Sequence, residues 1–266
     1  MSLANTPMIW NGQGPIMIGT YDPIKGREEM GFLTNLYSVG CGNRTFTTTP
    51  GRETEIIPES CSGQRLPLKE METGKSLGVA LEMVQFDGRT LARGFYGDAI
   101  EKPAGTVTAE RLTELAVGDY FTLKHPRSSS VVIEDSTAGT PLVYVEGTHY
   151  EVRDADHSLY RLLEHPATHV EPVLVDYAHA AYLNIAAFSK TNVERGIIFF
   201  GINGDGQKGR VIVPRISLAL SGDYGWLANT ASPLTLGGQA LYVPELANSS
   251  EYGPFMRIDL MPDLPV

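Results

Sequence analysis

The segment from Arg195 to Leu220 reads RGIIFFGINGDGQKGRVIVPRISLAL and carries the clearest strand pattern of the chain. Two apolar runs, residues 195–202 and 209–220, flank the tetrapeptide NGDG at 203–206, whose Asn-Gly and Asp-Gly pairs tolerate positive φ. This arrangement predicts an antiparallel β-hairpin. Pro214 interrupts the second run, and because proline donates no ladder hydrogen bond, we expect it at a bulge or on an open edge.

Apolar residues alternate with a period of two in further segments, which is typical of strands with one buried face. Residues 130–135 and 141–146 predict a second hairpin, and residues 239–246 and 255–260 predict two more strands. The 28 glycines and 17 prolines are about a sixth of the chain, against a usual share of roughly an eighth. This excess favours many turns between short strands.

Helical signals are few. Asp87 is placed to cap a short helix from Gly88 to Phe95, and residues 108–112 resemble the first turn of another. We therefore predict one domain over residues 1–266 with a mainly β fold, either a β-sandwich or a partly closed β-barrel, and one short flanking α-helix.

Charge and hydropathy exclude some classes of function. The chain has 31 acidic and 21 basic residues and a formal charge of −10, which argues against a sequence-specific DNA reader. Most of the acidic excess lies between Asp87 and Asp176. No apolar run approaches the roughly 18 residues of a membrane span, and residues 1–14 do not read as a secretory signal, so the cytoplasm is the expected place of synthesis.

The segment from Gly40 to Ser76 differs from the rest in having few large apolar residues, many threonines and balanced charges. A mobile surface loop is one interpretation. However, a structureless insertion of this length is uncommon in a compact domain, and Ile56 and Ile57 would be exposed in it. A long extended loop or hairpin arm over residues 40–76, ordered against a neighbouring molecule, explains both features.

No catalytic, cofactor or metal motif is complete. Gln207 separates Gly206 from Lys208, so the glycine-rich turn is not a phosphate-binding loop. His165 and His169 have zinc-ligand spacing, but a proline lies between them and no glutamate follows His165. We expect no cofactor and no metal here, nor at His157 with its neighbouring aspartates. Cys41 and Cys61 form no disulfide framework and are expected to be structural or free thiols.

Several blocks occur in an order that resembles the major tail tube proteins of long-tailed bacteriophages with flexible, non-contractile tails. The resemblance extends from about Val84 to Leu260. Its blocks are VQFD (84–87), GRTLARGFYG (88–97), GTVTAE (105–110), GDYFTLKH (118–125), PLVYVEGTHYEV (141–152) and IIFFGIN (197–203).

This resemblance implies a structural virion protein and no enzyme. In that family six copies form a ring, and the rings stack into a tube that encloses the tape-measure protein and later conducts the double-stranded genome during ejection. The expected partners are further copies of the chain, the tape-measure protein, the tail-end and terminator proteins, and DNA in transit without specific binding. The expected location is the phage tail, after synthesis in the bacterial host cytoplasm, with no membrane and no cofactor involved.

The resemblance also assigns roles to residues. We expect a grip between rings from the arm at 40–76, alongside an amino-terminal arm at 1–15. The candidate inter-ring residues are Arg44, Thr47, Arg52, Glu53, Ile56, Ile57 and Glu59. A lumen with net negative charge would repel a passing duplex, and the candidate acids are Glu134, Asp135, Asp154, Asp156, Asp205 and Asp223.

Two other classes of function remain open from the sequence. A soluble β-sandwich that binds carbohydrate or a receptor would stay monomeric and would present an aromatic-rich concave site. A hydrolase whose residues meet only in three dimensions would show a deep pocket with perturbed acids.

Overall fold

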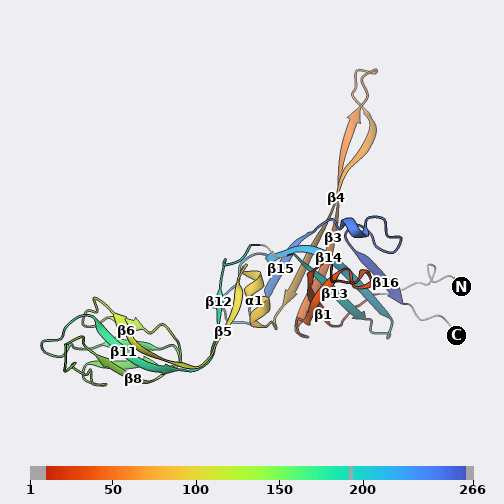
Figure 1. Ribbon diagram of the computed structural model, residues 1–266. Coiled ribbons are helices and arrows are strands. Elements are labelled where there is room, and N and C mark those ends of the chain that lie inside the picture. Colours follow the sequence, from red (N-terminus) through yellow and green to blue (C-terminus); the bar gives the residue numbers. More distant parts are fainter. Residues whose placement is uncertain (1–9, 192–193, 262–266) are drawn as a thin grey trace. The chain divides into compact units, whose positions relative to one another are not determined.

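The computed structural model describes residues 10–191 and 194–261 and is mainly β (Figure 1). The chain divides into two compact units, Met1–Ala99 with Ile185–Val266 and the inserted Ile100–Asn184. The sequence prediction of one domain over 1–266 did not include this division. Of the predicted amino-terminal arm at 1–15, residues 1–9 lie outside the described residues.

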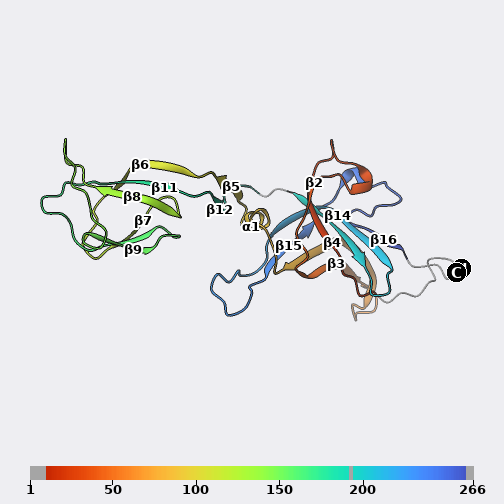
Figure 2. The ribbon, with the colours of Figure 1, turned by 90° about the horizontal axis from the view of Figure 1, so that it is seen from below.

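The first unit contains an eight-stranded sheet, seen from a second direction in Figure 2. Its strands are β1 (Ile16–Tyr21), β2 (Leu33–Ser38), β3 (Asn43–Pro58), β4 (Pro67–Met83), β13 (Arg195–Ile202), β14 (Lys208–Leu220), β15 (Leu234–Ala240) and β16 (Arg257–Met261). The spatial order is β2-β1-β13-β14-β15-β4-β3, with β16 pairing to β14, and neighbouring strands are antiparallel.

The predicted hairpin of residues 195–220 is confirmed as β13 and β14. The amide of Asn203 donates to the carbonyl of Gln207 at 2.7 Å, and the amide of Gly206 donates to the carbonyl of Asn203 at 2.9 Å, which closes the turn. Pro214 lies where the pairing shifts register, since Ile197 pairs with Val213 but Arg195 pairs with Ile216. The prediction of a bulge at the proline is also confirmed.

Both faces of this sheet are buried in part. On β4, Leu77, Val79, Leu81 and Met83 alternate with more exposed residues and join the larger core. A second cluster around Leu33, Ile198, Ile212 and Leu246 covers the other face. The rings of Phe46 on β3 and Phe199 on β13 lie 5.8 Å apart although these strands are not neighbours in the sheet. The sheet therefore bends over its core.

Helix α1 (Gly88–Gly94) is the only α-helix in the described part of the chain, and it confirms the predicted short helix. The carboxylate of Asp87 accepts the amide of Thr90 at 2.8 Å and its hydroxyl at 2.7 Å, which caps the first turn. Two 3₁₀ turns, η2 (Glu28–Met30) and η3 (Pro244–Leu246), complete the helical content of the described residues. None of these helices is long enough to cross a membrane.

The second unit has its own core and two three-stranded sheets. One sheet has the order β7-β10-β9 and the other β6-β11-β8. The strands are β6 (Gly105–Leu112), β7 (Tyr120–Thr122), β8 (Ser128–Glu134), β9 (Tyr150–Asp154), β10 (Leu159–Leu162) and β11 (Val173–His179). Both sheets contribute to one aromatic-rich core that includes Phe121, Tyr150, Tyr160 and Tyr177. The two connecting segments, β5 (Asp98–Lys102) and β12 (Tyr182–Ala186), pair with each other.

The predicted helical turn at residues 108–112 is wrong, because these residues belong to β6 and pair with β11. The pairing shifts register at this point, and Ala109 has a φ of 55°. The amide of Ala109 donates to the carboxylate of Asp176 at 2.7 Å instead of to the ladder. A β-bulge therefore lies where the local sequence suggested a helical turn.

The second predicted hairpin is also only partly present. Residues 130–135 overlap β8, but the segment 141–146 forms isolated bridges at Val143 and Glu146 and no strand. Two backbone hydrogen bonds still join the segments, from the amide of Asp135 to the carbonyl of Leu142 at 3.0 Å and from the amide of Tyr144 to the carbonyl of Ile133 at 2.8 Å. However, the carboxylate of Asp135 takes the amide of Leu142 at 2.6 Å. Near the carboxyl end, the strand predicted at 239–246 is wrong over most of its length, because it overlaps β15 only at Gln239 and Ala240 and Pro244 begins η3.

The cap of α1 gives a first test. Replacing Asp87 by Ala removes an acceptor for the orphan amide of Thr90, so we expect a loss of about 1 kcal/mol in the free energy of unfolding. Urea denaturation measures this loss. The matched control is Asp223→Ala, at an exposed loop position of the same unit, which should change the free energy by less than about 0.5 kcal/mol. Equal effects of the two substitutions would argue against the cap.

Candidate functional site

The predicted arm at residues 40–76 is a long β-hairpin. Strands β3 and β4 pair from Asn43 and Met83 at the sheet to Pro58 and Pro67 near the tip. Strand β4 also pairs with β15, but only between Gly78 and Met83. Beyond this point no other strand of the described residues joins the hairpin, and Figure 1 shows it projecting from the sheet. We call this part, residues 50–76, the free ribbon.

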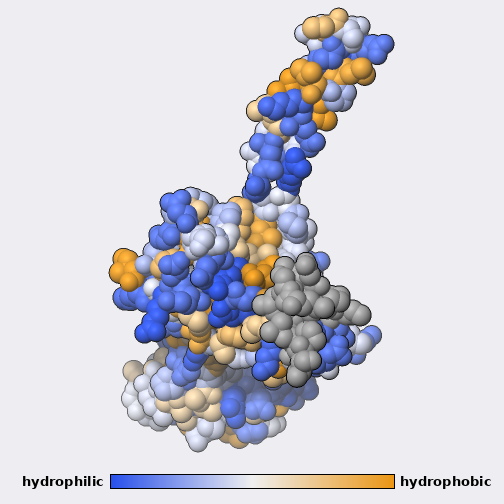
Figure 3. All heavy atoms as spheres, turned by 90° about the vertical axis from the view of Figure 1, so that its right-hand side faces the viewer, coloured by the Kyte–Doolittle hydropathy of each residue, from blue (hydrophilic) through white to orange (hydrophobic). Residues whose placement is uncertain are grey.

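Large apolar side chains are exposed near the tip of the free ribbon (Figure 3). They are Ile56, Ile57, Leu66, Leu68 and Met71, with exposed fractions of 57, 38, 52, 70 and 44 %. An isolated two-stranded hairpin is at best marginally stable in water because it has no interior. Such a group of exposed apolar side chains on a projecting element is typical of a contact surface for another molecule.

The apolar side chains occupy both faces of the ribbon. Paired residues on antiparallel strands share a face, so Ile57 lies beside Lys69, and Ile56 lies on the opposite face beside Glu70. A partner that covered one face alone would therefore leave apolar area in water on the other. This geometry favours insertion of the ribbon between other protein surfaces.

Ion pairs link the strands below the tip. The guanidinium of Arg52 lies 3.1 Å from the carboxylate of Glu72 and 3.6 Å from that of Glu70, and the ammonium of Lys75 lies 3.0 Å from Glu72. These side chains are largely exposed, and exposed ion pairs contribute at most about 1 kcal/mol each. They align the strands but do not replace burial.

Glu59 organises the tip. Its carboxylate accepts the amides of Cys61 and Ser62 at 2.6 and 2.8 Å and the hydroxyl of Ser62, and the amide of Glu59 donates to the carbonyl of Leu66 at 2.8 Å. The hydrogen bonds from Ser62 and Cys61 lower the pKa of Glu59 to about 2. The turn therefore keeps its negative acceptor throughout the neutral range.

The predicted arm residues fall into two groups. Arg52, Glu53, Ile56, Ile57 and Glu59 lie on the free ribbon or its tip. By contrast, the other two candidates lie at the root, where β3 is part of the large sheet. Arg44 is 3.4 Å from Glu82, and Thr47 pairs with Ala80.

Three exposed apolar residues on the second half of the hairpin, Leu66, Leu68 and Met71, were not singled out from the sequence. Their signal was available in the alternation of Leu66 and Leu68 around Pro67. It was hidden because the segment as a whole is rich in charged and small residues.

Among the candidate lumen acids, Asp135 requires a correction. Asp135 is buried, and its carboxylate accepts the amides of Leu142, Val170 and Thr137 at 2.6, 3.0 and 3.2 Å and the hydroxyl of Thr137. Desolvation acts to raise its pKa, but these hydrogen bonds outweigh it and lower the pKa to about 2. Asp135 therefore joins its own loop, through Thr137 and Leu142, to the segment at Val170 and presents no charge to a lumen.

The other five acids are divided between the two units. Asp205 and Asp223 are exposed in loops of the first unit, whereas Glu134, Asp154 and Asp156 belong to the second. Glu134 is half-buried at the end of β8. Asp154 accepts from the amide of His157 at 3.0 Å, and Asp156 is exposed, 3.8 Å from Arg127.

One group could offer metal ligands. Ligand atoms of His165, His169 and Glu171 all lie within 4.8 Å of one another, and Glu171 is a member that the sequence spacing did not indicate. However, the two imidazoles are stacked at 3.9 Å with an interplanar angle of 6°, so their nitrogen lone pairs do not converge on one point. The nitrogens of His165 also lie 2.8 Å from the carbonyl of Leu115 and 2.9 Å from the hydroxyl of Tyr144. A metal would have to displace these contacts.

The two cysteines are free and exposed. Cys61 lies in the turn at the tip of the hairpin, and Cys41 lies just before its root.

Comparison with known proteins places the chain in a family. Residues 9–259 match the model of the family described as "Protein of unknown function UCP028589". The chain belongs to this family. The match includes the free ribbon and the whole inserted unit, so both are within the part that defines a UCP028589 member. No curated protein matches the chain.

The buried carboxylate of Asp135 gives a second test. Its folded pKa of about 2 lies below the usual value of 3.8, so its contribution to stability is fully present above about pH 4 and is lost as the pH falls toward 2. Asp135→Asn should lower the melting temperature at pH 7 and reduce its fall between pH 5 and pH 2, measured by circular dichroism. The control is Asp156→Asn, which alters an exposed carboxylate. An unchanged pH profile in Asp135→Asn would contradict this role.

Proposed function

We propose that this chain is the subunit of a bacteriophage tail tube, in which hexameric rings stack into a conduit for genome ejection. We infer the tube, the virion location and the enclosed tape-measure protein from the order of the sequence blocks between Val84 and Leu260. The observation that carries it is the free ribbon, which exposes five large apolar side chains on two faces without a third strand.

The energetics favour burial of the ribbon between copies. An isoleucine that passes from full exposure to full burial contributes about 1.5–3 kcal/mol. Because Ile56 and Ile57 are only 57 and 38 % exposed, their burial together offers about that amount per arm, and Leu66, Leu68 and Met71 add to it. Ordering two side chains at an interface costs about 1–3 kcal/mol. Six arms per ring act together, so a modest surplus at each arm is multiplied by avidity.

The sheet also offers open edges. Strands β2 and β3 stand at the two ends of the strand order, so each has one edge without a sheet neighbour. An open edge is an aggregation risk in a monomer, but it becomes a specific contact when identical copies close into a ring. We further propose that the bent sheet forms a partly closed β-barrel. The contact of Phe46 with Phe199 across the sheet supports this.

The net charge suits transit of DNA. A wall with few cations facing phosphate does not release counterions and therefore does not bind a passing duplex. Repulsion from carboxylates acts over a Debye length of roughly 8 Å. Asp205 and Asp223 are the exposed candidates on the first unit. The proposed role needs no cofactor and no catalytic residue.

Removing the apolar side chains at the tip tests the arm. We expect Ile56→Ser with Ile57→Ser to fold normally but to lose stacking of rings, because about 1.5–3 kcal/mol of apolar burial is removed from each of the six arms of a ring. Sedimentation velocity over a range of concentrations and negative-stain microscopy measure assembly. The matched control is Ile24→Ser, at an isoleucine of the same unit that is 91 % exposed and lies off the arm. Tubes of normal length in the double variant would exclude the arm as the grip.

Charge reversal tests the lumen. If Asp205 and Asp223 face the bore, replacing both by Lys should slow DNA ejection from particles, and replacing both by Asn should have a smaller effect. Release of DNA on triggering with purified receptor is followed by a fluorescent dye. Particle yield and tail length serve as controls for assembly. Identical ejection rates for the wild type and the lysine variant would remove these two residues from the lumen.

A carbohydrate- or receptor-binding module is the second candidate. The observation in its favour is Tyr120 on the inserted unit, which is 58 % exposed and has the guanidinium groups of Arg153 and Arg161 at 5.9 and 5.5 Å from its ring centre. Exposed aromatic rings flanked by arginine suit stacking on a ligand. A compact monomer at high protein concentration would favour this candidate over the tail tube.

A further inference from the structure

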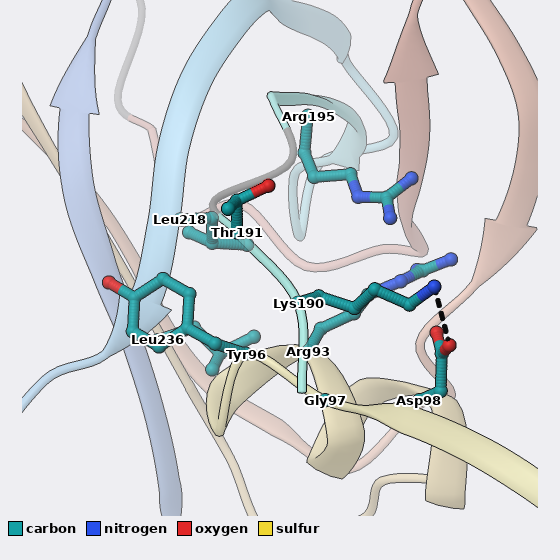
Figure 4. Close-up of a pocket in the computed structure, with 9 residues that line it drawn as sticks. All are labelled: Arg93, Tyr96, Gly97, Asp98, Lys190, Thr191, Arg195, Leu218 and Leu236. Atoms are coloured by element: carbon teal, nitrogen blue, oxygen red, sulfur yellow. Dashed lines mark ion pairs between the residues drawn. The ribbon is translucent and has the colours of Figure 1, made fainter. Parts of the chain in front are cut away.

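A pocket in the first unit gathers three cationic side chains (Figure 4). Arg93 comes from α1, Arg195 begins β13, and Lys190 precedes it in the chain. Figure 4 shows the three side chains extending toward the same side of the pocket. Among the residues that line the pocket, Asp98 carries the only carboxylate.

That carboxylate is already used. The ammonium of Lys190 lies 2.9 Å from the carboxylate of Asp98. Glu194, next to Arg195 in sequence, pairs with Arg215 through two hydrogen bonds of 2.6 and 2.7 Å. Arg195 donates to the hydroxyl of Thr20 at 2.5 Å, which is a neutral acceptor. Within the described residues, the two arginines of the pocket therefore have no carboxylate partner.

Two buried polar atoms at this place also lack partners. Nη1 of Arg93 is buried and forms no hydrogen bond with any described residue, and the same holds for the hydroxyl of Tyr37. The guanidinium carbon of Arg93 lies 4.1 Å from the centre of the Tyr37 ring, although Tyr37 itself does not line the pocket. Both groups are hydrogen-bond donors. Buried donors are nearly always satisfied in folded proteins, so an acceptor from outside this chain is expected here.

The electrostatics point in the same direction. Burial, together with the charge of Arg195, lowers the pKa of Arg93 to about 10, and burial also lowers the pKa of Arg195. Both shifts mean that the charged forms are disfavoured by their surroundings. Two half-buried cations without an anion are unfavourable, and an anion between them would reverse the sign of the interaction.

We propose that this pocket is a binding site for an oxyanion, with the guanidinium groups of Arg93 and Arg195 as its donors. The planar fork of a guanidinium fits the paired oxygens of a carboxylate or a phosphate, which makes these two groups the chemical class of the ligand. One source is a free anion such as inorganic phosphate. The other is a carboxylate side chain of a second copy of this chain, and this source rests on the proposed self-assembly.

The first arm of the experiment uses inorganic phosphate and the unassembled protein. Calorimetry and thermal unfolding are recorded against phosphate, with chloride at equal ionic strength as the reference. We expect saturable binding to the wild type that is at least about tenfold weaker in Arg93→Met, because a charge-assisted hydrogen bond is lost. Arg93→Lys, which keeps the charge but not the fork, should be intermediate. Arg89→Met is the matched control, since Arg89 is exposed on the same helix.

The phosphate-free measurement separates binding from a structural role. If Arg93 awaits an anion, Arg93→Met removes a disfavoured buried charge, and its melting temperature without phosphate should equal or exceed that of the wild type. A merely structural arginine would instead give a lower melting temperature and no dependence on phosphate. This readout remains available whether or not the protein assembles.

The second arm measures self-association of the same variants by sedimentation. Weaker association of Arg93→Met than of Arg89→Met, without phosphate binding to the wild type, would assign the site to a carboxylate of a second copy. Phosphate binding that depends on Arg93 would assign it to a free anion, even if the protein stays monomeric and the tail-tube proposal fails. The oxyanion site is overturned if Arg93→Met matches Arg89→Met in both phosphate binding and association.

Discussion

A two-stranded ribbon has two faces and no interior, so it cannot bury its own apolar side chains. Beyond the point where β4 leaves β15, only β3 and β4 pair with each other, so apolar side chains at the tip cannot be covered by this hairpin. Burial of Ile56 and Ile57 on opposite faces has to come from another surface. The rest of the first unit holds this ribbon in place.

The strand that forms the ribbon also belongs to the core. Along β4, the alternating residues Leu77 to Met83 are buried in the sheet, and the same strand continues outward to Pro67. The first unit therefore anchors the exposed tip through an unbroken strand with a packed root. A contact made at the tip is transmitted into the sheet without a flexible loop between them, which suits a load-bearing joint between copies better than a transient recognition loop.

Much of this architecture could be predicted from local sequence. The β13–β14 hairpin follows from apolar runs around NGDG, the bulge from Pro214, and the cap of α1 from Asp87, because turn chemistry and capping act over a few residues. The predictions for residues 108–112 and 141–146 were wrong because side-chain hydrogen bonds outweighed the local sequence pattern. Asp176 draws the amide of Ala109 out of a helix-like segment, and Asp135 takes the amide of Leu142 from a strand-like one. Neither composition nor hydrophobic periodicity indicates that these two carboxylates accept hydrogen bonds from those amides. The pocket of Arg93 and Arg195 lies still further from local pattern, since these residues are about a hundred positions apart.

The net charge of −10 makes the half-buried Arg93 and Arg195 informative. Copies of an acidic chain repel one another at long range, but salt limits this repulsion to roughly 8 Å, so contact-level forces decide association. Apolar burial is one such force, and an ion pair in a desolvated pocket is another. The chain has more acidic than basic residues. A shortage of carboxylates therefore does not explain why these two guanidinium groups have no carboxylate partner among the described residues. The arrangement is understandable if the missing anion is supplied after folding, when a ligand or a neighbouring copy arrives.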